Sequence, residues 1–143
     1  MKPTTEILAS INQNSKSYPY EVFTKLYRYM LRPDIYFLAY KHLYANNGAA
    51  TPGVDKDDTA DGFSEAKIAR IIESLREGSY QPKPVRRTYI DKKNRSGKKR
   101  PLGLPGLTDK LIQEVIRMIL EAVYEPVFSP QSHGFRPGRS CHT

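Results

Sequence analysis

Residues 83–105, KPVRRTYIDKKNRSGKKRPLGLP, decide how the rest of the chain is interpreted. This segment holds nine basic residues and one acid, Asp91, so it carries the same net charge, +8, as the whole protein of 143 residues. The remaining residues therefore balance, and the surplus positive charge is concentrated in one short stretch. Such clustering favours a polyanion as the partner.

The same segment has the pattern of a β-hairpin. Residues 85–92 place β-branched and aromatic side chains between charged ones, which indicates a strand with at least one solvent-exposed face. Residues 94–97 have turn chemistry, and Gly97 can take a positive φ without steric cost. Residues 98–104 have the alternating pattern of a returning strand. Pro101 has no backbone N–H to donate to a neighbouring strand, so this strand should be short or lie at the edge of a sheet. We predict a basic antiparallel hairpin whose tip carries most of the charge. A run of charges is also typical of a disordered or merely solvated stretch.

Composition limits the class of protein. The length is that of one domain, and the 38% hydrophobic content is ordinary for a globular fold. No apolar run approaches the ~20 residues needed to span a bilayer. The N-terminus lacks the apolar core of a signal peptide, and the single cysteine, Cys141, fits a reducing compartment. We therefore expect a cytoplasmic protein with no membrane partner.

Helical periodicity accounts for most of the remaining chain. A short or frayed helix is expected within residues 1–17, followed by helices over residues 19–32, 33–47, 64–78 and 108–125. Ser64 and Thr108 are suitable N-caps, and Pro19 suits a first helical turn. The last helix carries the clearest apolar stripe, which indicates core packing. We predict a mostly helical α+β fold with one hairpin.

The loop at residues 48–62 contains four aspartates, which raises the hypothesis of a metal site. A calcium-loop register starting at Asp57 fails, because its twelfth position is Ile68 rather than an acid. Helix capping and turn formation explain these aspartates better. We predict no metal site and no cofactor in this chain.

The sequence contains phosphate-contacting residues but no complete catalytic set. The histidines and Cys141 lack metal-ligand spacing, and no glycine-rich phosphate loop is present. Arginine forks and lysines on a ribbon can clamp the phosphates of a nucleic acid or a nucleoside triphosphate. Phe135, with Arg136 and Arg139 close by in the sequence, suits ribose and base contact. The predicted nucleic-acid-binding residues are Arg86, Arg87, Lys93, Arg95, Lys98, Lys99, Phe135, Arg136 and Arg139.

Three segments together resemble the N-terminal part of bacterial group II intron-encoded reverse transcriptases and maturases. They are NNGAATPGVD at 46–55, QPKPVRRTYIDKKNRSGKKRPLGLP at 81–105 and LTDKLIQEVIRMILEAVYEPVFSPQSHGFRPGRSCHT at 107–143. The most specific piece is SHGFRPGRS at 132–140. The resemblance implies the fingers module of a right-hand polymerase.

The resemblance also implies a division of the chain and roles for individual residues. Residues 1–62 would be an N-terminal helical extension with an RNA-contacting loop, and residues 63–130 the fingers with the hairpin at 85–104. Residues 131–143 would begin the fingers–palm junction, with the palm truncated. Lys92 and Arg100 would grip the triphosphate of the incoming nucleotide, and Arg136 and Arg139 would lie along the nucleic-acid track.

As a whole, the resemblance implies an RNA-directed DNA polymerase that supports intron splicing and mobility. Its expected partners are intron or template RNA, a DNA target or primer, a dNTP, and the palm and thumb regions. The carboxylates that hold Mg²⁺ are expected beyond Thr143, so this chain alone is expected to be inactive. The alternative is a stand-alone RNA-binding or assembly module from a split or truncated reverse transcriptase. An exposed apolar face on residues 109–125 would then favour a homodimer or a missing subunit.

Overall fold

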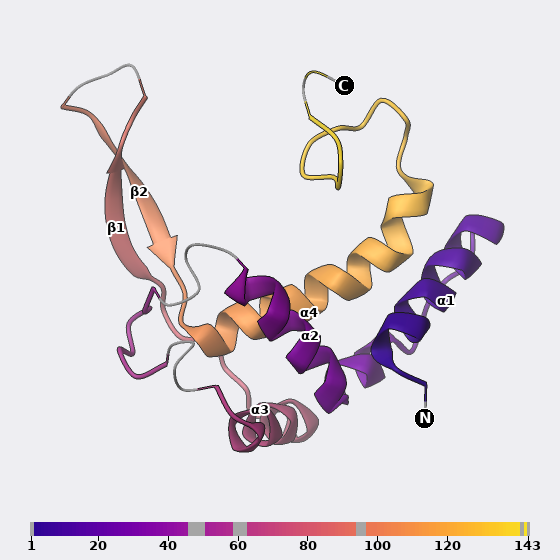
Figure 1. Cartoon of the computed structure of the whole chain (residues 1–143), viewed down its shortest axis with the longest axis horizontal. Coiled ribbons are helices and arrows are strands. Elements are labelled where there is room, and N and C mark those ends of the chain that lie inside the picture. The colour runs from indigo at the N-terminus through magenta and orange to yellow at the C-terminus, as the bar shows by residue number, and fades with distance from the viewer. Residues whose placement is uncertain (1, 46–50, 59–62, 94–96, 141, 143) are drawn as a thin grey trace. The chain divides into compact units, whose positions relative to one another are not determined.

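The computed structural model describes residues 2–45, 51–58, 63–93, 97–140 and 142. Its elements, in chain order, are α1 (Thr4–Ser17), η1 (Leu26–Leu31), α2 (Pro33–Tyr44), α3 (Glu65–Glu77), β1 (Arg86–Asp91), β2 (Lys99–Leu104), α4 (Leu107–Tyr124) and η3 (Glu125–Val127) (Figure 1). Here η marks a 3-10 helix. This is the predicted α+β fold. Over the described residues, no helix combines the length and the apolar character that crossing a membrane requires.

The chain forms two compact units. Met1–Tyr29 and Ile116–Thr143 make the first, and Met30–Val115 makes the second. Helix α4 contributes its second half to the first unit and its first half to the second. The predicted boundaries at residues 62 and 130 stay a prediction.

Helix α3, in the second unit, begins and ends as its sequence predicts. The Ser64 hydroxyl accepts a hydrogen bond from the Lys67 N–H at 3.1 Å, which caps the first turn. Gly78 ends the helix with φ 75°, a left-handed conformation that costs glycine little. One face of the helix is buried. The core of this unit comes from α2, α3 and the first half of α4: Ile35, Tyr36, Ala39, Ile68, Ile71, Ile72, Leu75, Leu107, Leu111, Ile112 and Val115.

Helix α1, in the first unit, is a full helix of 14 residues rather than a frayed one. Its Ile11 packs with Ala122 and Val123 of α4 in a buried cluster. The Asn12 amide donates to the Ala122 carbonyl at 3.3 Å, and the Ser15 hydroxyl donates to the Val123 carbonyl. The last carbonyls of a helix have no partner within it. Helix α1 therefore satisfies the end of α4 as well as covering its apolar face.

The predicted helix over residues 19–32 is wrong for most of its length. Residues 18–25 are not helical, and only the 3-10 turn η1 forms. Helix α1 ends at Ser17, and Tyr18 has φ −129° and ψ 75° because the residue before a proline avoids the helical region. The apolar spacing reflects packing instead, since Phe23 and Leu26 lie against the buried cluster of this unit.

The start of α4 differs from the sequence prediction in one respect. The helix begins at Leu107, so Thr108 lies in its first turn and is not its cap. The capping group is Asp58, whose carboxylate accepts hydrogen bonds from the Thr108 N–H at 3.2 Å and hydroxyl at 2.8 Å. A charged acceptor from a distant loop makes stronger bonds here than a local hydroxyl would. The predicted roles of the aspartates are confirmed at Asp58 and at Asp55, which accepts from the Asp57 N–H in a turn.

Candidate nucleic-acid interface

The predicted hairpin is present. Strands β1 and β2 pair antiparallel, from Arg86 opposite Leu104 to Asp91 opposite Lys99 (Figure 1). Beyond the strands, the Lys92 N–H donates to the Lys98 carbonyl at 3.0 Å. At the turn, Gly97 has φ 85°, as its sequence context predicts. The rest of the turn, with Arg95, lies outside the described residues.

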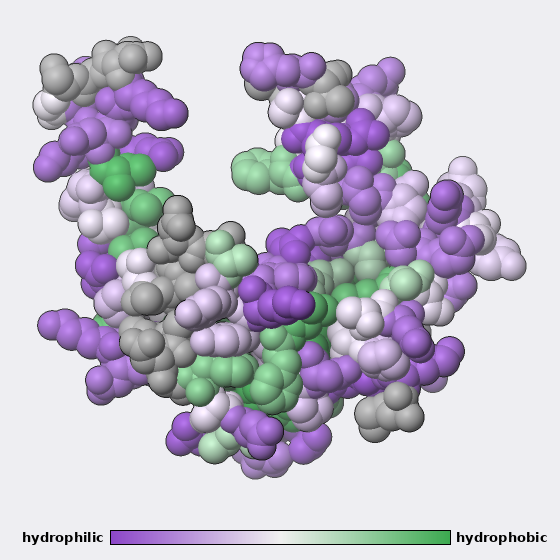
Figure 2. All heavy atoms as spheres, in the orientation of Figure 1, coloured by the Kyte–Doolittle hydropathy of each residue, from purple (hydrophilic) through white to green (hydrophobic). Residues whose placement is uncertain are grey.

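The hairpin projects into solvent on both faces. Side chains alternate along a strand, so Ile90 shares a face with Arg100, while Tyr89 and Pro101 share the other. Every described residue of the two strands is exposed except Thr88, Ile90 and Leu104, which are half-buried. Figure 2 shows hydrophilic side chains towards the far end of the hairpin and a short hydrophobic stretch nearer its base. Packing of a core therefore does not explain why this ribbon is ordered and basic.

Most basic side chains that the structure describes in the hairpin are exposed. Six of them make no hydrogen bond or ion pair with another described residue, and we refer to these as the hairpin cations: Arg87, Lys92, Lys93, Lys98, Lys99 and Arg100. Like charges gathered on a narrow ribbon repel one another. A polyanion would relieve that repulsion, whereas internal acids do not.

At the base of the hairpin, by contrast, basic side chains hold the loop at residues 51–58. Arg86 Nε donates to the Pro52 carbonyl at 3.2 Å, and Lys83 Nζ pairs with the Asp55 carboxylate at 3.0 Å. The hydrogen bond between them raises the pKa of Lys83 and lowers the pKa of Asp55. Arg86, a predicted nucleic-acid contact, thus also serves to attach this loop.

Two buried aspartates fix the chain where it enters the hairpin and where α4 starts. Asp58 pairs with Lys67, and both side chains are largely buried. Asp109 accepts from the Tyr80 hydroxyl and from the Lys83 backbone N–H at 3.1 Å. Burial raises the pKa of the Asp58 carboxyl, but hydrogen bonds from Lys67 and Thr108 outweigh it, and the pKa lies below its usual value. Sequence reasoning recognised Asp58 only as a general capping residue and missed Asp109 as an anchor.

Two glycines allow the loop to approach this point closely. A Cβ on Gly53 would lie 2.5 Å from the Gly106 nitrogen, and a Cβ on Gly106 would lie 2.6 Å from an Asp58 carboxylate oxygen. Real Cβ atoms do not come so close to backbone, so position 53 requires glycine, whereas a side chain at position 106 would have to displace the Asp58 carboxylate. The base of the hairpin, the loop and the start of α4 therefore form one tightly packed region.

The second predicted binding region is the C-terminal loop, residues 128–140. The three residues predicted here to contact nucleic acid differ in their exposure and in their partners. The Phe135 ring is fully exposed, and the residue has φ 58°, which is rare for a residue other than glycine. The Arg136 side chain is only 7% exposed and pairs with Glu125 at 2.9 Å. Arg139 donates to the Pro130 carbonyl at 2.7 Å. The roles of all three in nucleic-acid binding stay predictions.

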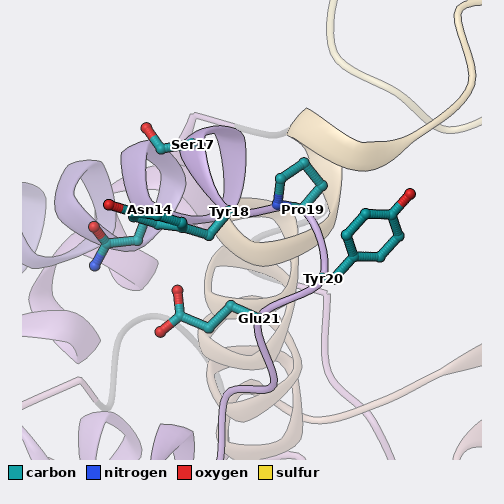
Figure 3. Close-up of a pocket in the computed structure, with 6 residues that line it drawn as sticks. All are labelled: Asn14, Ser17, Tyr18, Pro19, Tyr20 and Glu21. Carbon is teal, nitrogen blue, oxygen red and sulfur yellow. The ribbon is translucent and has the colours of Figure 1, made fainter.

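A pocket of about 580 Å³ lies where α1 ends. Figure 3 shows the residues that line it: Asn14, Ser17, Tyr18, Pro19, Tyr20 and Glu21. In this view the Tyr20 side chain points away from α1, and its ring is almost fully exposed. The lining has one acid and no basic residue. A pocket of this composition does not attract phosphate, so it is not a candidate site for nucleic acid.

A metal site is not formed by the described part of the chain. Across residues 2–45, 51–58, 63–93, 97–140 and 142, no three histidine, cysteine, aspartate or glutamate side chains group in a way that could hold an ion. The buried Asp58 and Asp109 are occupied by protein donors instead. The binding of Mg²⁺ by the expected larger enzyme stays a prediction.

Comparison with known proteins identifies the relatives of this chain. It is 65% identical over all 143 residues to the group II intron-encoded protein LtrA of Lactococcus lactis subsp. cremoris. It is 46% identical over 138 residues to an uncharacterised 91 kDa protein in the cob intron of Schizosaccharomyces pombe. It is 54% identical over 83 residues, 58% of the chain, to Nuclear intron maturase 1 of Arabidopsis thaliana. No protein-family model matches the chain.

The chain is therefore a homologue of group II intron-encoded proteins, and the resemblance inferred from its motifs is confirmed. It spans 24% of the length of the Lactococcus lactis relative and 17% of the Schizosaccharomyces pombe relative. The names of these relatives describe one as a group II intron-encoded protein and another as an intron maturase.

Proposed function

We propose that this chain is the fingers region of an RNA-directed DNA polymerase and intron maturase, and that it binds intron or template RNA. The observation that carries the proposal is the set of hairpin cations, which are exposed, unpaired among the described residues and held on an ordered ribbon. Phosphate contacts supply most of the sequence-independent affinity of proteins for nucleic acids. The relationship to intron-encoded proteins makes intron RNA the favoured polyanion.

Two of the hairpin cations have a more specific proposed role. Lys92 and Arg100 grip the triphosphate of the incoming dNTP, opposite the DNA primer or target that the full polymerase engages. Lys92 lies just beyond β1, and Arg100 lies in β2 opposite Ile90. A lysine point charge and an arginine fork are complementary ligands for a chain of phosphates. The catalytic Mg²⁺ belongs, in this proposal, to palm carboxylates that this chain does not supply.

The salt dependence of RNA binding tests the proposal. We expect the affinity for a structured group II intron RNA to fall by about 10³ between 50 and 200 mM salt if roughly six phosphates are neutralised. The measurement is a titration of labelled RNA at several salt concentrations. An affinity that hardly changes with salt would contradict binding through the hairpin cations.

The nucleotide role is tested by comparing adjacent lysines. Lys92→Gln should weaken dNTP binding at least about tenfold, because a charge-assisted hydrogen bond contributes roughly 1.5–3 kcal/mol. Lys93→Gln removes the same charge next to it and should have a smaller effect. Calorimetry measures the dNTP affinity of both variants. Equal losses of affinity would mean that Lys92 attracts the nucleotide only through non-specific charge.

A second candidate function is an assembly module, and one observation favours it. Ile116, Leu120 and Tyr124 recur every fourth residue on α4 and are 38%, 43% and 49% exposed. Large apolar side chains in a row mark a surface for another polypeptide, here the palm of the polymerase or a second copy of this chain. Sedimentation of a clean monomer at high protein concentration would exclude the homodimer.

A further inference from the structure

Arg136 uses its guanidinium to hold the protein's own C-terminal loop. Its Nε donates to the Glu125 carboxylate at 3.1 and 3.3 Å, and its Nη2 donates to the same carboxylate at 2.9 Å. Its Nη1 donates to the carbonyls of Ser129 at 2.8 Å and Ser132 at 2.7 Å. All three nitrogens are thus engaged, and the group also lies 5.2 Å over the Phe128 ring.

This arrangement disfavours direct phosphate contact by Arg136. The side chain is 7% exposed, and its fork, the part that would bind a phosphate, faces the Glu125 carboxylate. A phosphate would have to displace that carboxylate while being repelled by it. The two carbonyls lie at the two ends of the turn at residues 129–132, so removing the guanidinium would leave that turn without the donor that both carbonyls share.

The residue next to Arg136 is the one that needs such support. Phe135 has φ 58°, which costs a non-glycine residue free energy. Its ring is fully exposed, so no packing of its own holds it there. A strained and unsupported aromatic side chain keeps its conformation only if neighbouring contacts impose it. The five hydrogen bonds of Arg136 supply most of those contacts, and Arg139 adds its bond to the Pro130 carbonyl.

We propose that Arg136 is a positioning residue with Glu125 as its anchor, and that together they present Phe135 for stacking on an unpaired base of RNA. The inference rests on the proposed function, since it assigns roles within the RNA-binding surface. Stacking on an aromatic ring is sequence-tolerant and suits single-stranded RNA. Glu125 thereby promotes RNA binding through the position of Phe135, although its negative charge repels the phosphates of the RNA.

Whether one substitution strengthens or weakens RNA binding distinguishes a positioning role of Arg136 from direct phosphate binding. Glu125→Gln removes a negative charge, so it should strengthen binding if Arg136 binds phosphate directly, because it would release the guanidinium. If Arg136 positions Phe135, the same change should weaken binding of single-stranded poly-uridine RNA about tenfold, the effect of losing one stacked base. The matched control is Glu121→Gln, which removes an equal charge from the surface pair with Arg117. The control should not weaken binding.

Coupling to Phe135 separates positioning from general damage to the fold. In a Phe135→Ala background, Glu125→Gln should cause no further loss, because the ring that it positions is gone. Arg136→Lys keeps the charge but removes the fork, so it should weaken binding as much as Glu125→Gln without changing the salt slope. If Arg136 instead bound a phosphate directly, removing its charge with Arg136→Gln would lower the slope by about one. Additive losses, or stronger binding by Glu125→Gln, would overturn the inference.

A readout without RNA keeps this inference distinct from the proposed function. The chain contains no tryptophan, so Phe135→Trp introduces a single reporter in the loop. Its fluorescence anisotropy should fall when Glu125→Gln or Arg136→Lys is added and should not fall with Glu121→Gln, with circular dichroism confirming helix content. Unchanged anisotropy would overturn the positioning role whatever the RNA result. Wild-type protein that binds no RNA would instead overturn the proposed function, and with it the stacking role.

Discussion

The hairpin and the C-terminal loop contain the same kinds of residue, and the two regions use them differently. In the hairpin, Arg100 and its neighbours are exposed and lack partners among the described residues. In the C-terminal loop, Arg136 is buried against Glu125 and two carbonyls. An arginine with acids and carbonyls within reach becomes part of the fold, whereas one on a ribbon without them is available to a ligand. Five predictions test this difference.

The largest effect is expected from removing charge from the hairpin. Changing Lys92, Lys93, Lys98 and Lys99 together to glutamine should lower RNA affinity about 10³-fold near 0.1 M salt, and the slope of affinity against salt by about three. The control changes four exposed lysines elsewhere, Lys16, Lys25, Lys41 and Lys56. Equal losses in both variants would mean that overall charge, and not the hairpin, attracts RNA.

Next in size is the loss of the buried pair at the hairpin base. Asp58→Asn leaves Lys67 without its partner and should lower the free energy of unfolding by about 3 kcal/mol. Asp57→Asn, at an exposed neighbour, should change it little. Urea unfolding followed by circular dichroism measures both. Similar stability of the two variants would mean that the base is held mainly by its glycine contacts.

The same carboxyl gives the second unit a defined dependence on pH. The folded-state pKa of Asp58 is lowered, so its contribution to stability is present above the pKa of an unfolded aspartate, about 4, and is lost as the pH falls through the folded value. Wild-type protein should therefore lose stability below about pH 4 more steeply than Asp58→Asn does.

A smaller effect on stability is expected when one arginine from each region is replaced. Arg136→Ala should cost about 2 kcal/mol of stability, because it removes charge-assisted hydrogen bonds from a side chain that is 7% exposed. Arg100→Ala should stay within about 0.5 kcal/mol, as exposed substitutions usually do. Thermal unfolding of both variants measures the difference. If Arg100→Ala proved the more destabilising, the contrast between the two regions would fail.

The smallest effect concerns backbone conformation at a glycine of each region. Gly97→Ala places a side chain at φ 85° and should cost about 1 kcal/mol. Gly134→Ala meets no atom within 4 Å and needs no positive φ, so it should be nearly neutral. Hydrogen exchange of the β1 and β2 amides would report whether Gly97→Ala loosens the hairpin.

Local sequence rules succeeded where the deciding contacts are local. Helix α3 begins after Ser64 and ends at Gly78 as expected, and the hairpin forms over nearly the predicted residues. They failed between residues 19 and 32, where apolar spacing reflects packing against α1 and α4 rather than a helix. They also missed Asp109, because its partners Tyr80 and Lys83 lie 29 and 26 residues away in the chain.

The sequence by itself determined the α+β fold class, the cationic hairpin and the relationship to intron-encoded proteins. These follow from periodicity, charge count and motif order, which need no knowledge of distant neighbours. Only the tertiary structure decided which arginines are available to a ligand and which hold the fold. That choice depends on whether a carboxylate or a free carbonyl lies within hydrogen-bond distance, and Glu125 reaches Arg136 only because the chain between them folds back.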